Sequence, residues 1–425
     1  MNKQENKTLG TVLVYDSGGL YIHLAERLTK EFKEVLYFCD WKGSVMFPES
    51  YKMNLGQGIP NVTRLDSFEQ GRDRADLIVF PDCQHGDIQM DLQKRGFKCF
   101  GGGSATKLEN NRKYFKEKLK EWGLPLNDFD IEKGIDNLMK NIEKAELPVF
   151  VKISETRGDM ETKGVFDIVN ARSFFALQKI SMGLNGEKRD FIIEKNLPGI
   201  ECGIDTLCIK GTMPNMVQAG IEGKDAFYFC RMIERDMLPK GMEDINEKLC
   251  AYIKENEVST FICTENRVND RVFYFTDATI RGGIPPTETM MTNFTNLGDM
   301  LMKGAEGICE EPKFQKEYAC QLILKSDEIL SRELRVTFDK KYRDNIHFYN
   351  YCMKDGDVYT VPMNTPGHNI VCSVIGLGDS LEEARENLYE IADTIKTDDL
   401  CIDTHAFDDM YDIIDDCYKE GIKIF

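Results

Sequence analysis

A lysine stands inside an otherwise apolar segment, Pro148–Ile153 (PVFVKI), which we expect to form a buried strand. Because an unpaired buried charge is costly, the ammonium of Lys152 needs an anionic partner. The polar, glycine-containing segment Ser154–Gly164 (SETRGDMETKG) follows it. A hairpin of this kind beside a strand lysine suits a phosphate clamp made of ammonium and backbone N–H groups. The pattern is not a P-loop, since GxxxxGK[ST] is absent. Taken alone, a salt-bridged lysine on an edge strand is the better explanation.

A second apolar segment, Phe191–Glu194 (FIIE), ends at Lys195-Asn196-Leu197, and Glu201 follows shortly after. Backbone groups at the end of a strand can hydrogen-bond the edge of an adenine, and a nearby carboxylate can accept two ribose hydroxyls. When this segment is considered alone, an ordinary solvated turn explains it better.

A third cluster, Asp277-x-Thr279-x-Arg281, follows the apolar segment Val272–Phe275 (VFYF). Alternation along a strand places these three side chains on one face. A carboxylate and a hydroxyl can hold Mg²⁺ between nucleotide phosphates, and the planar fork of the arginine can bind a carboxylate or a phosphate. Gly282-Gly283 would let a substrate approach the backbone. A twisted strand with a surface ion pair is the alternative, but three such clusters in this order are hard to attribute to coincidence.

The composition describes an acidic, folded protein. The 425 residues include 54 Lys and Arg against 72 Asp and Glu, a formal net charge of −18. Such a surface repels phosphate backbones, so we expect no nucleic-acid polymer as a partner. No apolar window approaches the ~18 residues that span a membrane, and the polar Met1–Leu9 is no secretory signal. Fourteen scattered cysteines, and five histidines at no metal-binding spacing, indicate reduced thiols and a cytoplasmic location.

The first hundred residues alternate short apolar runs with helical stretches, which predicts a parallel sheet flanked by helices. The expected strands are Thr11–Tyr15, Val35–Phe38, Leu77–Phe80 and Phe97–Phe100. Ligands of such sheets bind at the carboxyl ends of strands, where Asp16–Gly19 and Gly101–Gly103 would lie. Further helices are expected over Lys107–Trp122, Phe314–Arg332 and Leu381–Ile395, the last one capped by Asp379-Ser380.

The order of these features resembles the ATP-grasp ligases, and among them most closely the phosphoribosylamine–glycine ligase family. The resemblance covers nearly the whole chain and rests on Gly103–Pro125 (GSATKLENNRKYFKEKLKEWGLP), Pro148–Val165, Ile193–Glu201, Phe273–Pro285 and Gly367–Ala384 (GHNIVCSVIGLGDSLEEA). These segments are similar, in that order, to the family's G-P-S-x-x-A-x-L-E-x-S-K, V-x-K-A…G-K-G-V, E-E-F-L-x-G-x-E, V-I-E-F-N-x-R-x-G-D-P and G-G-R-V-L-x-V-x-A-x-G-x-x-x-x-E-A patterns. The last match selects this family among the ATP-grasp enzymes.

The resemblance implies an α/β protein with an N-terminal parallel-sheet domain, an α+β ATP-grasp domain and a small C-terminal domain. We expect these domains at residues 1–105, 106–320 and 321–425, with a lid subdomain at about 126–195. It also implies an ATP-dependent ligase that uses Mg²⁺ and joins a small-molecule carboxylate to a small-molecule amine, as a monomer or a dimer.

The resemblance also assigns binding positions. The family's nucleotide-binding positions fall on Arg112, Lys113, Lys152, Lys163, Glu194, Lys195, Leu197 and Glu201. Lys152 would contact the α- and β-phosphates, Arg112 takes the place of another phosphate lysine with Lys113 as its alternative, and Glu201 would bind the ribose. The adenine would bind at Glu194 through Leu197.

The resemblance implies the metal-binding and catalytic positions as well. Asp277 and Thr279 stand where the family has a metal-binding glutamate and asparagine, and Arg281 aligns with its arginine. Lys152 and Arg281 would be the catalytic residues.

The substrate-binding segments of the family are poorly kept. Its G-G-R-E-H-A loop retains only Gly18 and Gly19, and its D-H-K-R segment is reduced to Glu222–Asp225. The G-D-P-E after the metal strand reads Gly283-Ile284-Pro285-Pro286. The expected substrate contacts are therefore Gly18, Gly19, Lys224, Arg281 and Gly283. Because the Arg-Glu-His is absent, we expect an amine other than phosphoribosylamine.

Three functions follow as hypotheses. In the leading one, ATP phosphorylates a carboxylate, and a nucleotide-like amine then attacks the acyl phosphate to form an amide with an amino acid. A genuine phosphoribosylamine–glycine ligase of purine synthesis would need Lys224 or Arg157 to bind the 5′-phosphate. A noncatalytic nucleotide-binding protein is slightly favoured by the short Asp277 and Thr279 pair, which would hold Mg²⁺ weakly.

Overall fold

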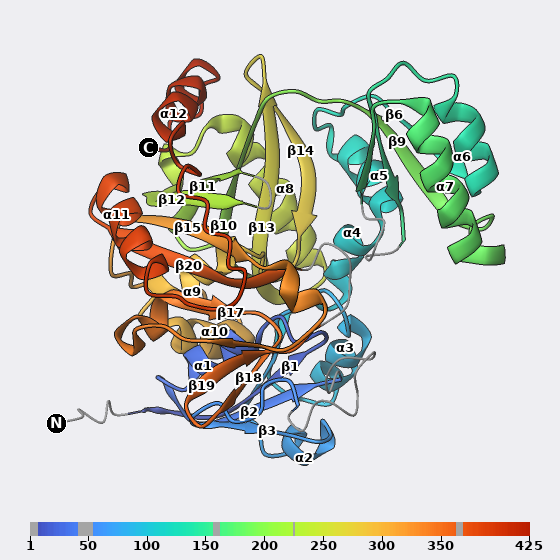
Figure 1. Cartoon of the computed structure of the whole chain (residues 1–425). Helices are drawn as coiled ribbons and strands as arrows, with labels where there is room; N and C mark the ends of the chain where they lie inside the picture. The colour runs from blue at the N-terminus through green and yellow to red at the C-terminus, as the bar shows by residue number, and fades with distance from the viewer. Residues whose placement is uncertain (1–6, 41–53, 156–161, 224–225, 363–368) are drawn as a thin grey trace.

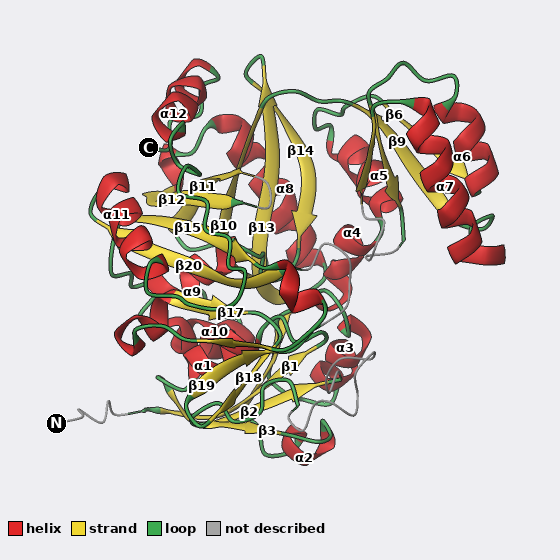
Figure 2. Ribbon diagram, viewed as in Figure 1, coloured by secondary structure: helices red, strands yellow, loops and turns green. Residues whose placement is uncertain are grey.

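The computed structural model describes residues 7–40, 54–155, 162–223, 226–362 and 369–425. Within these residues the largest sheet has thirteen strands in the order β17-β20-β15-β12-β11-β10-β13-β5-β4-β1-β2-β3, with β14 paired to β13. A four-stranded sheet and a three-stranded sheet accompany it. The helices pack on the faces of these sheets, as Figure 2 shows.

The N-terminal strands form the parallel part of the large sheet, which confirms the predicted α/β class. They are β1 (Leu9–Asp16), β2 (Phe32–Cys39), β3 (Val62–Arg64), β4 (Leu77–Phe80) and β5 (Cys99–Gly101), all paired in parallel. Three helices connect them: α1 (Ile22–Leu28), α2 (Glu69–Arg72) and α3 (Gly86–Lys94). Because side chains alternate along a strand, Val12 and Val14 pack into the main core, whereas Leu13 and Tyr15 pack into a second core on the other face.

The antiparallel part of the large sheet begins where β13 pairs with β5, at Ser259 and Gly101. Its strands are β10 (Ile200–Ile209), β11 (Met216–Gly223), β12 (Phe227–Glu234), β13 (Ser259–Asn269), β14 (Val272–Thr279), β15 (Tyr318–Lys325), β17 (Ile346–Phe348) and β20 (Ile370–Gly378). The accompanying helices are α4 (Lys107–Asn110), α5 (Arg112–Trp122), α8 (Lys240–Glu255), α9 (Pro286–Asn293) and α10 (Leu297–Ala305).

A small α/β unit stands apart from the large sheet, at the upper right of Figure 1. Its sheet has the order β6-β9-β7-β8. The unit consists of β6 (Phe129–Lys133), α6 (Ile135–Ile142), β7 (Val149–Ile153), β8 (Thr162–Val165), α7 (Ile168–Met182) and β9 (Asp190–Lys195). It has a hydrophobic core of its own, in which Val151, Phe175 and Phe191 are fully buried. A separate core lets this unit form one wall of a site without sharing packing with the large sheet.

The C-terminal part corrects one expectation. The predicted helix over Phe314–Arg332 is instead strand β15 followed by a short 3₁₀ turn, Asp327–Leu330. The run YACQLILK is buried almost throughout because β15 lies between β12 and β20, and a continuous apolar run fits a central strand as well as a helix. Residue 321, where a separate domain was expected to begin, lies inside this strand.

The remaining elements complete the C-terminal part. They are β16 (Leu334–Val336), β18 (Tyr351–Lys354), β19 (Asp357–Thr360), α11 (Leu381–Ala392) and α12 (Met410–Lys419). The predicted cap of α11 is confirmed, since the hydroxyl of Ser380 accepts a hydrogen bond from the backbone N–H of Glu383. In the part of the chain that the structure describes, no helix has the length and apolarity needed to cross a bilayer.

Candidate functional site

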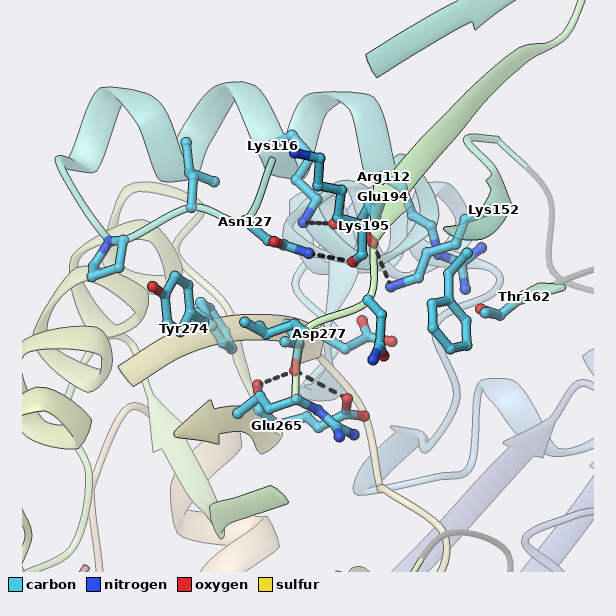
Figure 3. Close-up of a pocket in the computed structure, with 18 residues that line it drawn as sticks. Arg112, Lys116, Asn127, Lys152, Thr162, Glu194, Lys195, Glu265, Tyr274 and Asp277 are labelled. Carbon is cyan, nitrogen blue, oxygen red and sulfur yellow. Dashed lines mark hydrogen bonds and ion pairs between the residues drawn. The ribbon is translucent and has the colours of Figure 1, made fainter. Parts of the chain in front are cut away.

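Two pockets adjoin where the small unit faces the large sheet. The hinge pocket lies between the small unit, α5 and the β13–β14 hairpin (Figure 3). The sheet pocket lies over one face of β10–β14 and extends to the segment after β14. Each has a volume of about 260 Å³. The two are continuous, because four residues line both of them: Arg112, Thr162, Glu265 and Asp277.

A buried carboxylate in the hinge pocket is held between two lysines. Glu194, at the end of β9, is 6% exposed and forms an ion pair with Lys152 of β7, with 2.9 Å between Nζ and Oε2. Lys116 of α5 forms a second ion pair with Oε1 (Figure 3). Burial raises the pKa of Glu194, but the two ammonium groups outweigh it and lower the pKa to about 2. The carboxylate expected at the adenine is therefore the counter-ion of Lys152.

The same ion pair fixes the charge of Lys152. Burial lowers the pKa of Lys152, but Glu194 acts in the opposite direction and the net effect raises it. The lysine therefore keeps a full positive charge. This partner was not identified from the sequence, and neither was Lys116, which depends on how α5 packs against the small unit.

Apolar side chains also line the hinge pocket. They are Leu126, Phe150, Leu197, Tyr274 and Phe275. The backbone carbonyl of Lys195 accepts a hydrogen bond from the side-chain amide of Asn127, at 2.6 Å. Apolar walls beside strand-end backbone groups can hold a planar heterocycle.

Glu201 stands at the junction of the two pockets. It lies opposite Arg267 in the register of β10 and β13, and the two side chains form an ion pair. Glu201 lines the sheet pocket and Arg267 lines the hinge pocket. The remaining lone pairs of this carboxylate can accept hydroxyl hydrogen bonds.

Two carboxylates meet across the β13–β14 hairpin, and one of them was missed in the sequence. Glu265 and Asp277 are cross-strand partners, and both line both pockets. Thr279 lies further along β14, opposite Cys263, and lines only the sheet pocket. The turn at Asp270-Arg271, with φ values of 51° and 61°, pairs Asn269 with Val272, and continued unchanged this register would put Thr276 opposite Glu265. A β-bulge shifts the pairing by one residue and brings Asp277 opposite Glu265, so the turn alone could not have identified this partner.

This donor set fits Mg²⁺. The ion prefers oxygen ligands, keeps several waters and is held by one or two carboxylates together with substrate phosphates. Glu265 and Asp277 supply two carboxylates on one edge of the pocket. Among the described residues, no cluster of three or more acidic, histidine or cysteine side chains could hold a metal by itself. The arrangement therefore suits an ion that arrives with a phosphorylated ligand.

Arg281 is locked in place by the N-terminal part of the chain. Its Nε lies 2.9 Å from Glu109 Oε1 and 3.7 Å from Asp82 Oδ1, and its Nη1 donates to the Tyr21 hydroxyl at 3.0 Å. Nη1 also donates to the backbone carbonyl of Gly282. The guanidinium lines the sheet pocket, so three segments position one cation at its rim.

Two of the expected nucleotide-binding lysines, Lys113 and Lys163, lie outside the described linings of both pockets, whereas Lys195 lines the hinge pocket. Lys113 forms an ion pair with Asp190, at 3.0 Å. Lys163 lies over the ring of Phe174, at 4.6 Å from its centre. Arg112 differs from them, because it lines both pockets while donating to the backbone carbonyl of Ile153.

The expected substrate contacts are also divided. Gly283 lines the sheet pocket, together with Arg281. Gly18 and Gly19 lie elsewhere, and their backbone N–H groups donate to the buried carboxylate of Asp16, at 3.1 and 3.0 Å. Lys224 lies outside the described residues.

Comparisons with known proteins identify the fold. No protein-family model matches the chain. A stretch of 148 residues is 25% identical to the carbamoyl phosphate synthase large chain of Thermomicrobium roseum, and it covers 33% of this chain but only 13% of that protein. The chain is thus similar to a small part of a much longer relative.

Solved structures resemble the chain over most of its length. Phosphoribosylamine–glycine ligase of Thermotoga maritima superposes with a TM-score of 0.68 at 17% identity, covering 92% of this chain and 98% of that one. The MgADP-bound biotin carboxylase domain of the Hydrogenobacter thermophilus 2-oxoglutarate carboxylase gives 0.65 at 13% identity, covering 97% and 95%. L-amino acid ligase of Bacillus licheniformis gives 0.58 at 14% identity, covering 92% and 99%. These proteins are ATP-grasp enzymes, and the chain has the ATP-grasp fold.

Proposed function

We propose that the protein is an ATP-dependent ligase that joins a carboxylate to an amine through an acyl phosphate. One observation carries the proposal: a pocket lined by cationic and aromatic side chains opens, at Glu265 and Asp277, directly into a second, acidic pocket. A phosphoryl group at that junction would be within reach of a substrate on the other side. The names of the structural neighbours, two of which are ligases of amino acids or amines, support the same reaction class.

ATP would bind in the hinge pocket. Its adenine would lie between the apolar walls, against the backbone of Lys195–Leu197, and its ribose hydroxyls would donate to Glu201. Arg112 and Lys152 would bind the phosphates. Glu265 and Asp277 would hold Mg²⁺, which neutralises charge on the phosphates. The second carboxylate from Glu265 removes the main argument for a noncatalytic protein, which rested on Asp277 and Thr279 alone.

The reaction itself needs positioning and charge stabilisation more than covalent help. A carboxylate oxygen of the acid substrate attacks the γ-phosphorus, and ADP leaves. The amine nitrogen then attacks the acyl carbon, the bond from that carbon to the phosphate oxygen breaks, and the nitrogen loses its proton. Lys152 stabilises negative charge on the nucleotide side, and Arg281 lies on the side where the tetrahedral oxyanion forms.

A phosphoribosylamine–glycine ligase is the second candidate, and the similarity to the Thermotoga maritima enzyme favours it. The charge of the sheet pocket argues against it. Its described lining contains five carboxylates and two arginines. With Glu201, Glu265, Asp277 and Arg112 assigned to Mg-ATP, two carboxylates and one arginine remain for the substrate, and this excess of negative charge opposes a 5′-phosphate. Lys224 and Arg157, the groups expected to bind that phosphate, lie outside the described residues.

Trapping with hydroxylamine tests the proposed reaction without knowledge of the amine. Purified protein with Mg-ATP and each member of a panel of amino acids and other carboxylic acids should form a hydroxamate from at least one acid. Glycine with phosphoribosylamine belongs to the panel. ATP binding, seen as a thermal shift, without hydroxamate or phosphate release would support the noncatalytic function instead.

Replacement of the metal-binding carboxylate sharpens this test. Asp277→Asn should lower turnover on the order of 10²–10³-fold, about 3–4 kcal/mol, while ATP affinity stays within about tenfold. Asp270→Asn, at the exposed tip of the same hairpin, is the matched control and should leave turnover unchanged. Equal turnover of the wild-type and Asp277→Asn proteins would show that Asp277 does not hold the catalytic metal.

A further inference from the structure

The sheet pocket contains a buried carboxylate that the proposed ATP site does not use. Asp205 of β10 lines the sheet pocket but not the hinge pocket, and it is 3% exposed. Because residues two apart on a strand share a face, Asp205 lies on the same face of β10 as Gly203 and Glu201. It therefore belongs to the substrate side of the site.

The neighbours of Asp205 are neutral and hold it firmly. The hydroxyl of Tyr228 donates to Asp205 Oδ2 at 2.5 Å, and Gln218 Nε2 in turn donates to that hydroxyl at 3.2 Å. Gln218 and Cys263 are the cross-strand neighbours of Asp205 on β11 and β13. Gln218 is itself fixed, because its side-chain oxygen accepts from the hydroxyl of Thr289 at 2.7 Å.

A glycine makes this arrangement fit. The ring of Tyr228 lies across Gly220 of β11, so that a Cβ atom at position 220 would lie 2.5 Å from the ring carbon Cζ and from the hydroxyl oxygen. Any side chain there would push the tyrosine away from Asp205. Gly220 lines the same pocket. Residues of three strands, β10, β11 and β12, thus fix the position of the Asp205 carboxylate.

No cation accompanies Asp205 in the described ranges of the chain, where its neighbours are Tyr228, Cys263 and Gln218. Burial raises the pKa of Asp205, the three neighbours lower it, and the result is about 6. A buried charge without a counter-ion is costly, so a group of this kind at a pocket wall points to a ligand that brings the charge with it. An ammonium group has the charge and three N–H donors.

We propose that Asp205 binds the protonated amino group of a substrate and that Tyr228 positions the carboxylate. This assignment rests on the proposed ligase function, and it names the chemistry of the substrate: a primary ammonium group in the sheet pocket. The group can belong to the amine that is joined, whose ammonium must first pass one proton to Asp205 so that its nitrogen can attack, or to an amino acid that is activated, whose ammonium stays protonated. Both sources share the same recognition by Asp205.

The test compares Asp205→Asn, which removes the charge but keeps an acceptor for Tyr228, with the wild-type protein. Amide formation is measured as phosphate release with primary amines and amino acids. Activation is measured as hydroxamate formation with hydroxylamine, which is uncharged at neutral pH and needs no ammonium site. Each amino acid is paired with the hydroxy acid of the same side chain.

The two sources of the ammonium give different results. If it belongs to the amine, Asp205→Asn lowers kcat/KM for the amine about a hundredfold, while hydroxamate formation is unchanged. If it belongs to the activated amino acid, hydroxamate formation from the amino acid falls about a hundredfold, while formation from the hydroxy acid is unchanged. An Asp205→Asn protein that uses amines and amino acids as the wild type does would overturn the assignment.

Tyr228→Phe is the second variant and tests positioning. It keeps the charge, so the loss should be about tenfold. The acid limb of its pH–rate profile should move to higher pH, because the lost hydroxyl stabilised the charged carboxylate that Gln218 and Cys263 still face. A loss without this movement would assign Tyr228 a structural role only.

A binding measurement separates the assignment from the proposed reaction. If the wild-type protein forms neither hydroxamate nor amide, the ligase function fails. Thermal shift with the same amines and amino acids then decides the assignment. Compounds that stabilise the wild type but not Asp205→Asn support the ammonium site, and compounds that stabilise both or neither overturn it.

Discussion

Glu194 and Asp205 are both buried carboxylates at the walls of two adjoining pockets, but Glu194 is paired with cations and Asp205 is not. They are 6% and 3% exposed. The pKa of Glu194 is lowered to about 2 by Lys152 and Lys116 against the effect of burial, whereas burial without a cation raises that of Asp205 to about 6. Burial alone therefore does not decide the charge state. In the hinge pocket the protein itself supplies the counter-ions of Glu194. In the sheet pocket we propose that a bound ligand supplies the positive charge opposite Asp205.

Removal of the counter-ion from the hinge pocket should have the largest effect on stability. Glu194→Gln leaves Lys116 and Lys152 facing each other without an anion, and we expect a loss of about 3–5 kcal/mol of unfolding free energy at pH 7. Because the pKa of Glu194 is lowered, its ionised carboxylate stabilises the fold at pH values above the ordinary pKa of 4.5. This stabilisation is lost as the pH falls through about 2. Denaturant unfolding at several pH values measures both.

The control for this variant is an exposed ion pair on the same unit. Asp128→Asn removes the partner of Lys195, and both side chains are more than half exposed. It should change stability by less than about 1 kcal/mol, because exposed pairs are screened by water. A Glu194→Gln protein no less stable than Asp128→Asn at pH 7 would contradict the picture of a charge-balanced hinge pocket.

The opposite outcome is expected for Asp205. Because its pKa in the folded protein lies above the ordinary 3.8, its ionised form destabilises the fold, partly between pH 3.8 and 6 and fully above pH 6. The difference between about 6 and 3.8 corresponds to about 3 kcal/mol as an upper value. Asp205→Asn should thus be more stable than the wild type at pH 8 and equally stable below pH 4. A loss of stability at pH 8 would show that the ionised carboxylate is held by the protein itself.

The sequence predicted the parts of the site that lie along single strands. Lys152 of β7 and Asp277 of β14 stand out because each is a charged residue in or shortly after an apolar run, and Arg281 stands two residues beyond the end of β14. Glu265 depends on the register of a hairpin, and the turn at Asp270-Arg271 does not decide it, because a β-bulge next to Glu265 shifts the pairing by one residue. Local sequence patterns therefore pointed to Lys152 and Asp277, whereas Glu265 could be found only from the pairing of β13 with β14.

The counter-ions were out of reach for a different reason. Lys116 is one of several charged residues on α5, and only the packing of that helix against β9 selects it as the partner of Glu194. The same limit explains the expected helix over Phe314–Arg332, where burial between two strands outweighed helical propensity. In both places the outcome was decided by tertiary neighbours rather than by local sequence.

The smallest effect is expected at the junction of the two pockets, where Glu201 is paired with Arg267. Glu201→Gln removes a charged acceptor for the ribose hydroxyls, and ATP should bind about tenfold more weakly, about 1.4 kcal/mol. For 2′,3′-dideoxy-ATP, which lacks these hydroxyls, the two proteins should bind equally well. Titration calorimetry with both nucleotides makes the comparison. Equal weakening for both would mean that Glu201 acts through the charge of Arg267 and not on the ribose, and the junction would then belong electrostatically to the hinge pocket.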